Sequence, residues 1–180
     1  PLSPAGNSMM QSTPAPGAPG IPPTWCSSDK DLVGTAMGSA RLWYTLGHGI
    51  VNEVYYPRID IPQIRDLGFI VADDRGFWVE VKRLAAYDLQ LPTPGTPLPT
   101  ITHRHHRFTL ELRLCPDPER DVLLIESTLE GDARLRPYVV LAPRLGGSGR
   151  DNCAWAERYR GRTILWAEQG PFGLALSAVD

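Results

Sequence analysis

The stretch FTLELRLCPDPERDVLLIESTL, Phe108 to Leu129, indicates which class of fold this 180-residue chain adopts. From Phe108 to Leu114 apolar residues alternate with polar ones, a period of two that places the leucines on one face of a half-buried strand. Asp117-Pro118-Glu119 then predicts a turn. The return strand, Val122–Leu129, starts with a nearly continuous apolar run, which predicts burial on both faces. The stretch as a whole predicts a β-hairpin.

The same signal recurs on both sides of this hairpin. A second hairpin is predicted where the strands Asp66–Val71 and Gly76–Lys82 flank the short polar connection Ala72–Arg75. No segment of ten or more residues has helical periodicity. Short strands with glycine and proline between them predict an all-β fold, a large antiparallel β-sandwich. Further strands are expected at Arg134–Ala142, Cys153–Glu157, Thr163–Glu168 and Phe172–Ala178.

Composition divides the chain into two parts. Residues 1–23 are rich in proline and glycine and have no apolar periodicity, which predicts a flexible leader. Residues 24–180 have the size of one β-sandwich domain, in a chain with 42% hydrophobic residues. The last predicted strand ends at Ala178 and leaves a long open sheet edge, which is an aggregation hazard. We therefore expect a truncated sandwich that is part of a larger protein.

Charge and hydropathy argue against two kinds of partner. The net charge is -2 and the arginines are scattered, so no basic face is expected for nucleic acid. No run approaches the roughly 18 to 20 apolar residues that cross a membrane, and no secretory signal is visible, which favours the cytoplasm. Cys26, Cys115 and Cys153 are odd in number and far apart, which favours small apolar residues in a reducing compartment over a bridging or catalytic role.

Two motifs suggest ligand chemistry but lack parts that it needs. His103 and His105 would point to the same face of a strand and could share a metal ion, but a zinc site needs at least three protein ligands. We expect His103–His106 to form an exposed polar strand face, and we predict no metal and no cofactor. Gly146–Gly149 is followed by neither a Gly-Lys-Ser/Thr sequence nor a helix, so a flexible loop is expected there instead of a phosphate site.

Acidic residues near aromatic ones raise the question of catalysis. Glycoside cleavage needs two carboxylates on opposite sides of the scissile bond, and Glu53 and Asp60 could be such a pair. Their separation is not set by any period, so the sequence does not place them. An aldose epimerase would need a histidine and a glutamate, for which His48 and Glu53 are the available pair. Five residues apart, they would face opposite sides of a regular strand.

Tyrosine and tryptophan beside carboxylates are the usual components of a sugar platform, because ring faces stack on pyranose C–H groups. In a β-sandwich most such rings fill the core, so only those beside loops are candidates. Pro57 ends regular strand pairing and brings Tyr55 and Tyr56 to a strand terminus. The aromatic residues considered are Trp25, Trp43, Tyr44, Tyr55, Tyr56, Trp78, Trp155 and Trp166.

Four stretches follow one another in a specific order: APGIPPTWCSSDKDLVGTA (residues 18–36), SARLWYTLGHGIVNEVYYPRID (39–60), RDLGFIVAD (65–73) and DPERDVLL (117–124). In order and spacing they resemble the N-terminal β-domain of prokaryotic glucoamylases and glucodextranases, glycoside hydrolase family 15. The resemblance covers most of residues 18–129. Beyond about residue 134 only the strand pattern continues.

The resemblance implies a supersandwich, the galactose-mutarotase-like type of β-sandwich, that stands before an (α/α)6 barrel. The barrel would carry both catalytic glutamates, and its helices are not in this sequence. No catalytic residue is therefore assigned, and whether the chain is itself an enzyme stays open. The parent protein would hydrolyse α-glucosidic bonds of starch-like or dextran-like glucans.

The expected role of the chain is that of a non-catalytic accessory domain whose partners are the catalytic (α/α)6 domain of the same polypeptide and an α-glucan. The loop expected to contact sugar or barrel contains Glu53, Tyr55, Tyr56 and Arg58. The alternative is a stand-alone β-sandwich that is aldose-epimerase-like or binds carbohydrate.

Overall fold

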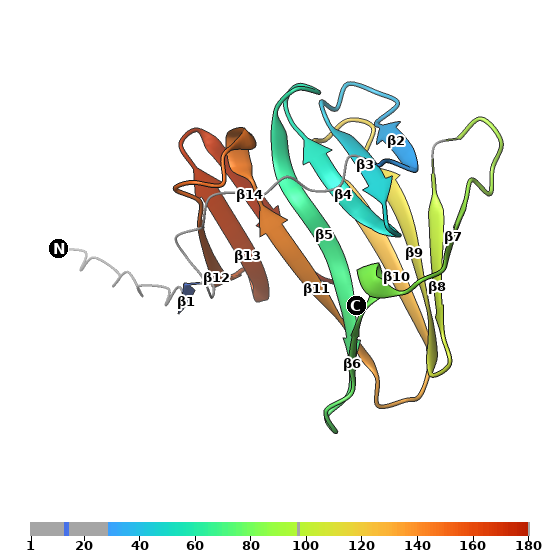
Figure 1. Cartoon of the computed structure of the whole chain (residues 1–180). Coiled ribbons are helices and arrows are strands. Elements are labelled where there is room, and N and C mark those ends of the chain that lie inside the picture. Colours follow the sequence, from blue (N-terminus) through green and yellow to red (C-terminus); the bar gives the residue numbers. More distant parts are fainter. Residues whose placement is uncertain (1–12, 15–28, 97, 180) are drawn as a thin grey trace.

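Three antiparallel sheets form the part of the chain that the computed structural model describes, residues 13–14, 29–96 and 98–179 (Figure 1). The largest sheet has the order β11-β5-β4-β3-β2, and β6 pairs with β5 beyond the first residues of β4. Its strands are β2 (Leu32–Thr35), β3 (Trp43–Gly47), β4 (Ile50–Tyr55), β5 (Pro62–Ala72), β6 (Trp78–Glu80) and β11 (Arg136–Pro143).

A four-stranded sheet of order β10-β9-β8-β7 lies behind the six-stranded sheet in Figure 1. Its strands are β7 (Tyr87–Gln90), β8 (Thr100–His105), β9 (Phe108–Pro116) and β10 (Leu123–Gly131). Side chains from the facing sides of these two sheets form one hydrophobic core, to which β9 contributes Phe108, Leu110, Leu112 and Leu114. The predicted alternation along β9 is thus confirmed, because the polar residues between these four are more exposed.

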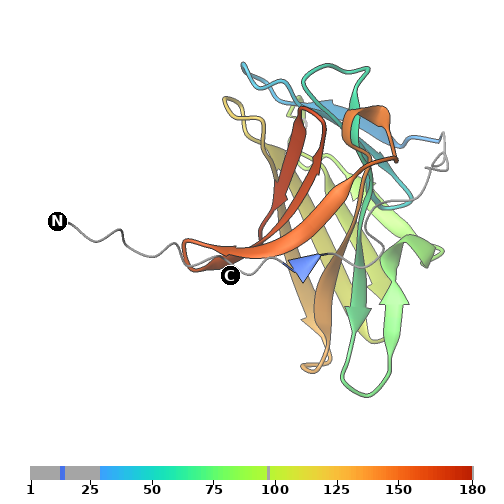
Figure 2. The same cartoon turned by 90° about the vertical axis from the view of Figure 1, so that its left-hand side faces the viewer.

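The third sheet, of order β1-β12-β13-β14, projects from the side of the two facing sheets (Figure 2). It contains β1 (Thr13–Pro14), β12 (Cys153–Tyr159), β13 (Arg162–Gln169) and β14 (Phe172–Leu176). Two short 3-10 helices, η1 (Val81–Arg83) and η2 (Leu145–Gly147), complete the described secondary structure. None of the described helices is long and apolar enough to span a membrane.

The predicted all-β antiparallel sandwich is confirmed, and both predicted hairpins are present. β9 and β10 pair from Phe108↔Gly131 to Pro116↔Leu123, on either side of the turn that begins at Asp117. β5 and β6 pair across the connection after Ala72. Within that turn the Asp73 carboxylate accepts hydrogen bonds from the backbone N–H groups of Arg75 and Phe77, which is the usual way an aspartate stabilises a turn.

The prediction that Val122–Leu129 is buried on both faces is wrong. Leu124 is 55% exposed and Val122 is 41% exposed. The reason lies in the position of β10, which is the last strand in its sheet, and in its outward face, which no described element covers. An apolar run alone does not distinguish an interior strand from such an edge strand.

The predicted leader, residues 1–23, lies outside the described residues except for Thr13–Pro14. These two residues form β1 and pair with Ala156 and Trp155 of β12.

Candidate functional site

The segment between β4 and β5 closes into a compact turn. The Tyr56 N–H donates to the carbonyl of Ile61 at 3.0 Å, and the Ile61 N–H donates to the carbonyl of Arg58 at 3.1 Å. β4 ends at Tyr55, as predicted from Pro57, and the Tyr56–Pro57 peptide bond is cis. The turn therefore holds its outermost residues, Arg58 to Asp60, away from the sheet.

Glu53 and Tyr55 lie together on the outer face of β4, the face that points away from the core. Their cross-strand partners on β3 are Thr45 and Trp43, whereas Val54 between them faces the core. The Tyr55 hydroxyl donates to Glu53 Oε2 at 2.6 Å, and Lys30 Nζ lies 2.9 Å from the same oxygen. Glu53 is 9% exposed, so its carboxylate is a largely buried acceptor held by a phenol and an ammonium group.

Tyr56 has different partners from its neighbour. An Arg41 guanidinium N–H donates to the Tyr56 hydroxyl at 2.9 Å, and the Arg41 guanidinium carbon lies 5.1 Å from the Tyr56 ring centroid. Arg41 is itself bound to Asp121, by its backbone N–H at 2.6 Å and by its guanidinium at 3.0 Å. These hydrogen bonds, that from the Arg41 N–H most of all, lower the pKa of Asp121 below its usual value.

Arg58 lies apart from the two tyrosines and their partners. Its guanidinium makes a two-point contact with Asp60, at 3.0 and 2.6 Å. The Arg58 side chain is 69% exposed and Asp60 is 57% exposed. The structure therefore divides the four predicted site residues among three places: Glu53 with Tyr55, Tyr56 with Arg41, and Arg58 at the exposed tip.

Gln63 connects this turn to the glycine-rich segment. Its side-chain N–H group donates to the Tyr56 carbonyl at 2.6 Å, and its side-chain oxygen accepts from the Gly146 N–H at 3.0 Å. Gln63 is 5% exposed. The segment predicted as a flexible loop, Gly146–Gly149, instead begins within the turn of helix η2, where Asn152 also accepts the Leu145 N–H at 3.0 Å.

No opposed pair of carboxylates forms around Glu53 among the described residues. Glu53 binds Lys30 and Tyr55, while Asp60 binds Arg58 at the tip of the turn. The histidine of the epimerase alternative, His48, is exposed and lies in the turn after β3 with a φ of 56°. His48 and Glu53 therefore do not face each other across a space where a sugar could bind, so the epimerase alternative is not favoured.

The prediction of an exposed polar face at His103–His106 is wrong for His103, whose exposed fraction is 0%. Its Nε2–H donates to the carbonyl of Gly49 at 2.7 Å, and Nδ1 has no hydrogen-bond partner. Burial lowers the pKa of His103. His105 lies on the same face of β8 and packs against Phe108, with ring centroids 5.0 Å apart. Across the described ranges, no group of three His, Cys, Asp or Glu side chains is arranged to hold a metal ion.

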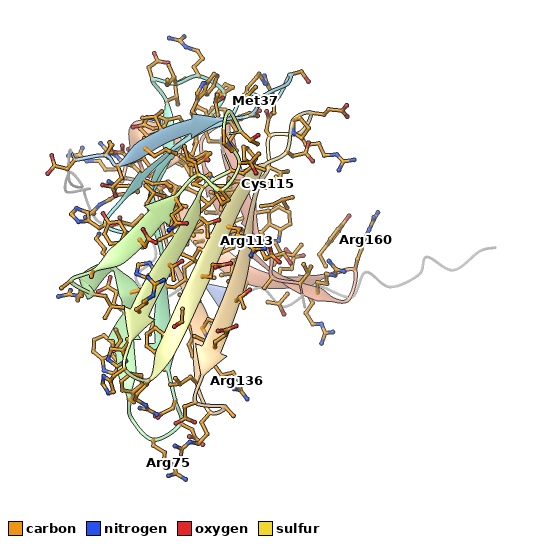
Figure 3. All side chains as sticks on the ribbon, turned by 90° about the vertical axis from the view of Figure 1, so that its right-hand side faces the viewer. Met37, Arg75, Arg113, Cys115, Arg136 and Arg160 are labelled. Atoms are coloured by element: carbon orange, nitrogen blue, oxygen red, sulfur yellow. The ribbon has the colours of Figure 1, made fainter. Side chains whose placement is uncertain are left out.

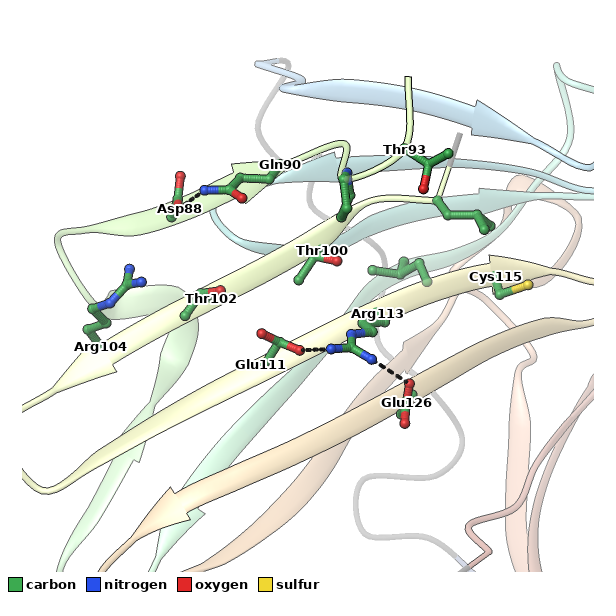
Figure 4. Close-up of a pocket in the computed structure, with 13 residues that line it drawn as sticks. Asp88, Gln90, Thr93, Thr100, Thr102, Arg104, Glu111, Arg113, Cys115 and Glu126 are labelled. Carbon is green, nitrogen blue, oxygen red and sulfur yellow. Dashed lines mark hydrogen bonds and ion pairs between the residues drawn. The ribbon is translucent and has the colours of Figure 1, made fainter. Parts of the chain in front are cut away.

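A shallow hollow of about 600 Å³ lies on the outer face of the four-stranded sheet (Figure 4). Its floor includes Thr100 and Thr102, and Arg113 reaches Glu111 at 2.9 Å and Glu126 at 3.7 Å. Cys115 is one of the residues that line it (Figure 4). The hollow is open, and three of its charged side chains, Glu111, Arg113 and Glu126, pair with one another. It therefore provides polar contacts without an enclosed site.

Cysteines and aromatic residues are more exposed than expected. Cys115 and Cys153 are exposed free thiols instead of apolar packing residues, whereas Cys26 and Trp25 lie outside the described residues. Of the other candidate rings, only Tyr44 lies fully in the core, and Trp78 is 64% exposed on the outer face of β6. The expectation that most of these rings fill the core is therefore wrong.

Sequence reasoning missed the residues that hold the candidate site in place: Lys30, Arg41, Gln63 and Asp121. Arg41 and Asp121 are 80 positions apart in the chain. The sequence around each of them predicts only an exposed charged residue in a turn or at a strand end. Nothing in that signal identifies a partner in another hairpin.

The described residues define a class of protein: a two-sheet antiparallel β-sandwich domain with a side sheet. A family model described as glucodextranase, domain N, matches residues 15–180. The chain belongs to this family, as the four ordered stretches predicted.

Two relatives support this assignment. A glucoamylase from Clostridium sp. (strain G0005) is 27% identical over 168 residues, which cover 89% of this chain and 24% of that protein. The crystal structure of a bacterial glucoamylase complexed with acarbose superposes with a TM-score of 0.82 at 26% identity, over 88% of this chain and 25% of that one. The chain thus spans about a quarter of the length of these relatives.

Proposed function

We propose that this chain is a non-catalytic accessory domain of an α-glucan hydrolase and that it packs on the catalytic domain of the same polypeptide. The observation that carries the proposal is the difference in coverage. The chain matches a glucoamylase along 89% of its own length but along only 24% of that protein. Glu53 is held by Lys30 and Tyr55, whereas Asp60 is held by Arg58 at the tip of the turn. A glycosidase needs two carboxylates across the scissile bond, so this separate placement supports the non-catalytic part of the proposal.

In this proposal the turn after β4 is the contact with the catalytic domain, and its residues have two different tasks. Glu53, Tyr55 and Tyr56 fix the shape of the turn through Lys30 and Arg41. Arg58 and Ile59 at the tip, with 69% of the Arg58 side chain and 59% of Ile59 exposed, make the contact itself. An arginine next to an exposed aliphatic side chain is typical of the residues that anchor protein interfaces.

The first test concerns catalysis. Residues 1–180, incubated with maltoheptaose, are expected to release no glucose above the buffer rate. Release that disappears in the Glu53→Gln variant would contradict the proposal, because it would assign the chemistry to this chain.

The second test concerns packing and uses the full polypeptide that carries this domain. Arg58→Ala combined with Ile59→Ala is expected to weaken the coupling between the domains, seen as separate thermal unfolding transitions and an altered kcat/KM for maltooligosaccharides. Arg160→Ala, at an exposed turn in the side sheet, is the matched control and should leave both unchanged. Tyr55→Ala and Tyr56→Ala are expected to act through the shape of the turn. If the tip variant behaves as the control does, the turn is not the contact.

A further inference from the structure

We propose that the outer face of the six-stranded sheet carries a binding site for a linear α-glucan, built on the exposed rings of Trp78 and Tyr138. The proposal deepens the proposed function, and it rests on that function for the choice of a glucan as the sugar. The geometry of the platform comes from the sheet itself.

The register of the sheet places both rings on the face that points away from the core. Trp78 on β6 is paired with Ala72 on β5, and Tyr138 on β11 is paired with Ile70 on β5. Paired residues, and residues two apart on a strand, point to the same side of a sheet. The intervening Val71 is fully buried in the core, so the face that carries both rings is the outer one. Trp78 is 64% exposed and Tyr138 is 55% exposed.

The two rings stand diagonally across β5, the strand between them. They are two strand spacings apart across the sheet and two residues apart along it, which puts their Cα atoms about 12 Å from each other. This distance is too long for two rings to stack on one sugar unit. It suits a short oligosaccharide that lies across β5 and stacks a different sugar unit on each ring.

Hydrogen-bonding groups occupy the other diagonal of the same platform. Glu80 is paired with Ile70, opposite Tyr138, and Arg136 is paired with Ala72, opposite Trp78. Arg83 holds the Glu80 carboxylate at 2.6 Å, and two backbone carbonyls, of Ala133 and Leu135, hold the Arg136 guanidinium at 2.7 and 2.8 Å. Figure 3 shows Arg136 and Arg75, in the β5–β6 turn, near one end of the molecule.

This alternation of rings and charged groups complements a pyranose chain. Each sugar unit has an apolar C–H face, which packs on an aromatic ring, and a rim of hydroxyls, which donate to a carboxylate and accept from a guanidinium. Ala72 and Ile70 form the floor between the rings, and both side chains are shorter than an indole or a phenol. Because a sugar hydroxyl both donates and accepts hydrogen bonds, a neutral glucan can bind to both Glu80 and Arg136.

The size of the platform favours an oligosaccharide over a protein partner. At 64% and 55% exposure, the two rings present roughly 250 Å² of aromatic surface. A stable protein interface buries about 800 Å² on each partner. A short sugar chain needs only two stacking contacts and a few hydrogen bonds, and the platform supplies these.

The test measures binding of maltoheptaose to residues 1–180 by isothermal calorimetry, with an isomaltooligosaccharide of the same length as the second probe. Trp78→Ala and Tyr138→Ala are each expected to weaken binding about tenfold, the effect of one lost stacking contact. Trp78→Phe should restore most of the affinity. Tyr159→Ala removes a ring of 43% exposure from the side sheet and is the matched control, expected to bind as the unchanged chain does. Far-ultraviolet circular dichroism and the thermal midpoint of each variant report whether it is folded.

Three results would overturn the proposal. They are the absence of binding to either sugar by the folded, unchanged chain, equal affinity in the Trp78→Ala variant, and an equal loss in the Tyr159→Ala control. None of these results bears on the assay for glucose release or on the Arg58 and Ile59 variants, so the proposed function is judged separately.

Discussion

His103 lies in the core with one ring nitrogen hydrogen-bonded to Gly49 and the other without a partner. Gly49 also packs tightly against His103, because a Cβ atom added at Gly49 would lie 2.4 Å from the His103 ring. The φ of Gly49 is 70°, in the left-handed region that favours glycine. Neither feature can be read from the run of histidines, because Gly49 is 54 positions away in the chain. A histidine on the apolar face of a strand is ambiguous until the opposite sheet is known.

Stability should therefore decline on mild acidification. The pKa of His103 is lower in the folded chain than its ordinary value near 6.5, so the proton is bound preferentially by the unfolded chain. The free energy of unfolding is therefore highest above about pH 6.5. At lower pH it decreases, by up to about 1.4 kcal/mol per pH unit for one proton. Urea denaturation between pH 5 and 8 measures this slope.

The variant His103→Gln keeps a side-chain N–H donor but does not titrate, so it should flatten that slope. His106→Gln changes an exposed histidine and serves as the control, with the slope retained. An unchanged slope in the His103→Gln variant would mean that another group titrates.

At the scale of elements, Arg107 joins three connections at one end of the sandwich. It lies in the turn between β8 and β9 and contacts Asp73, after β5, at 2.9 Å and Asp132, after β10, at 3.0 Å. Its guanidinium carbon is also 4.1 Å from the Phe77 ring centroid. The side-chain hydrogen bond from Arg107 lowers the pKa of Asp73, whose side chain is 2% exposed. This contact ties the two facing sheets together without using core residues.

Replacing Arg107 by methionine should lower the thermal midpoint by roughly 5 °C, because it leaves Asp73 covered without its cation. Arg107→Lys should recover only part of this loss, since one ammonium group does not reproduce the planar fork and its contact with a ring. Differential scanning fluorimetry measures both. Arg104→Met, at an exposed position on β8, is the control and should not shift the midpoint.

The strands could be predicted because their signal is local, while their partners could not. Alternation along Phe108–Leu114 and the turn at Asp117 define β9 and β10. The pairing of β11 with β5 joins residues that are more than 60 positions apart, and it places Tyr138 on the same face as Trp78. The same limit applies to the candidate site, where the resemblance identified Tyr55 and Tyr56 but not the basic groups that hold Glu53 and Tyr56.

At the scale of the whole molecule, β10 and β11 are the outermost strands of their sheets within the described residues. Both carry exposed apolar side chains, among them Leu124 at 55% and Val139 at 40%. Open apolar strand edges favour pairing between molecules. We therefore expect residues 1–180 to self-associate as their concentration rises, and light scattering over a dilution series measures this.

The variant Leu124→Lys places a charge near the start of β10 and should reduce the scattering. Thr163→Lys adds the same charge to β13, which is paired on both sides, and should not reduce it. Equal scattering from the two variants would show that net charge, and not the strand edge, controls association.

The side sheet has a consequence for the order in which the molecule opens. Among the side chains that the structure describes, its strands contribute one buried apolar residue, Ala167, whereas the buried core cluster is drawn from the two facing sheets and the segments that join them. Amide protons exchange with solvent through local opening, which is easiest where little apolar surface is covered. Deuterium uptake followed by mass spectrometry should show residues 153–176 exchanging well before β9. The domain would then consist of two parts that open at different rates. The side sheet would open and close many times in the time that the sandwich takes to unfold once.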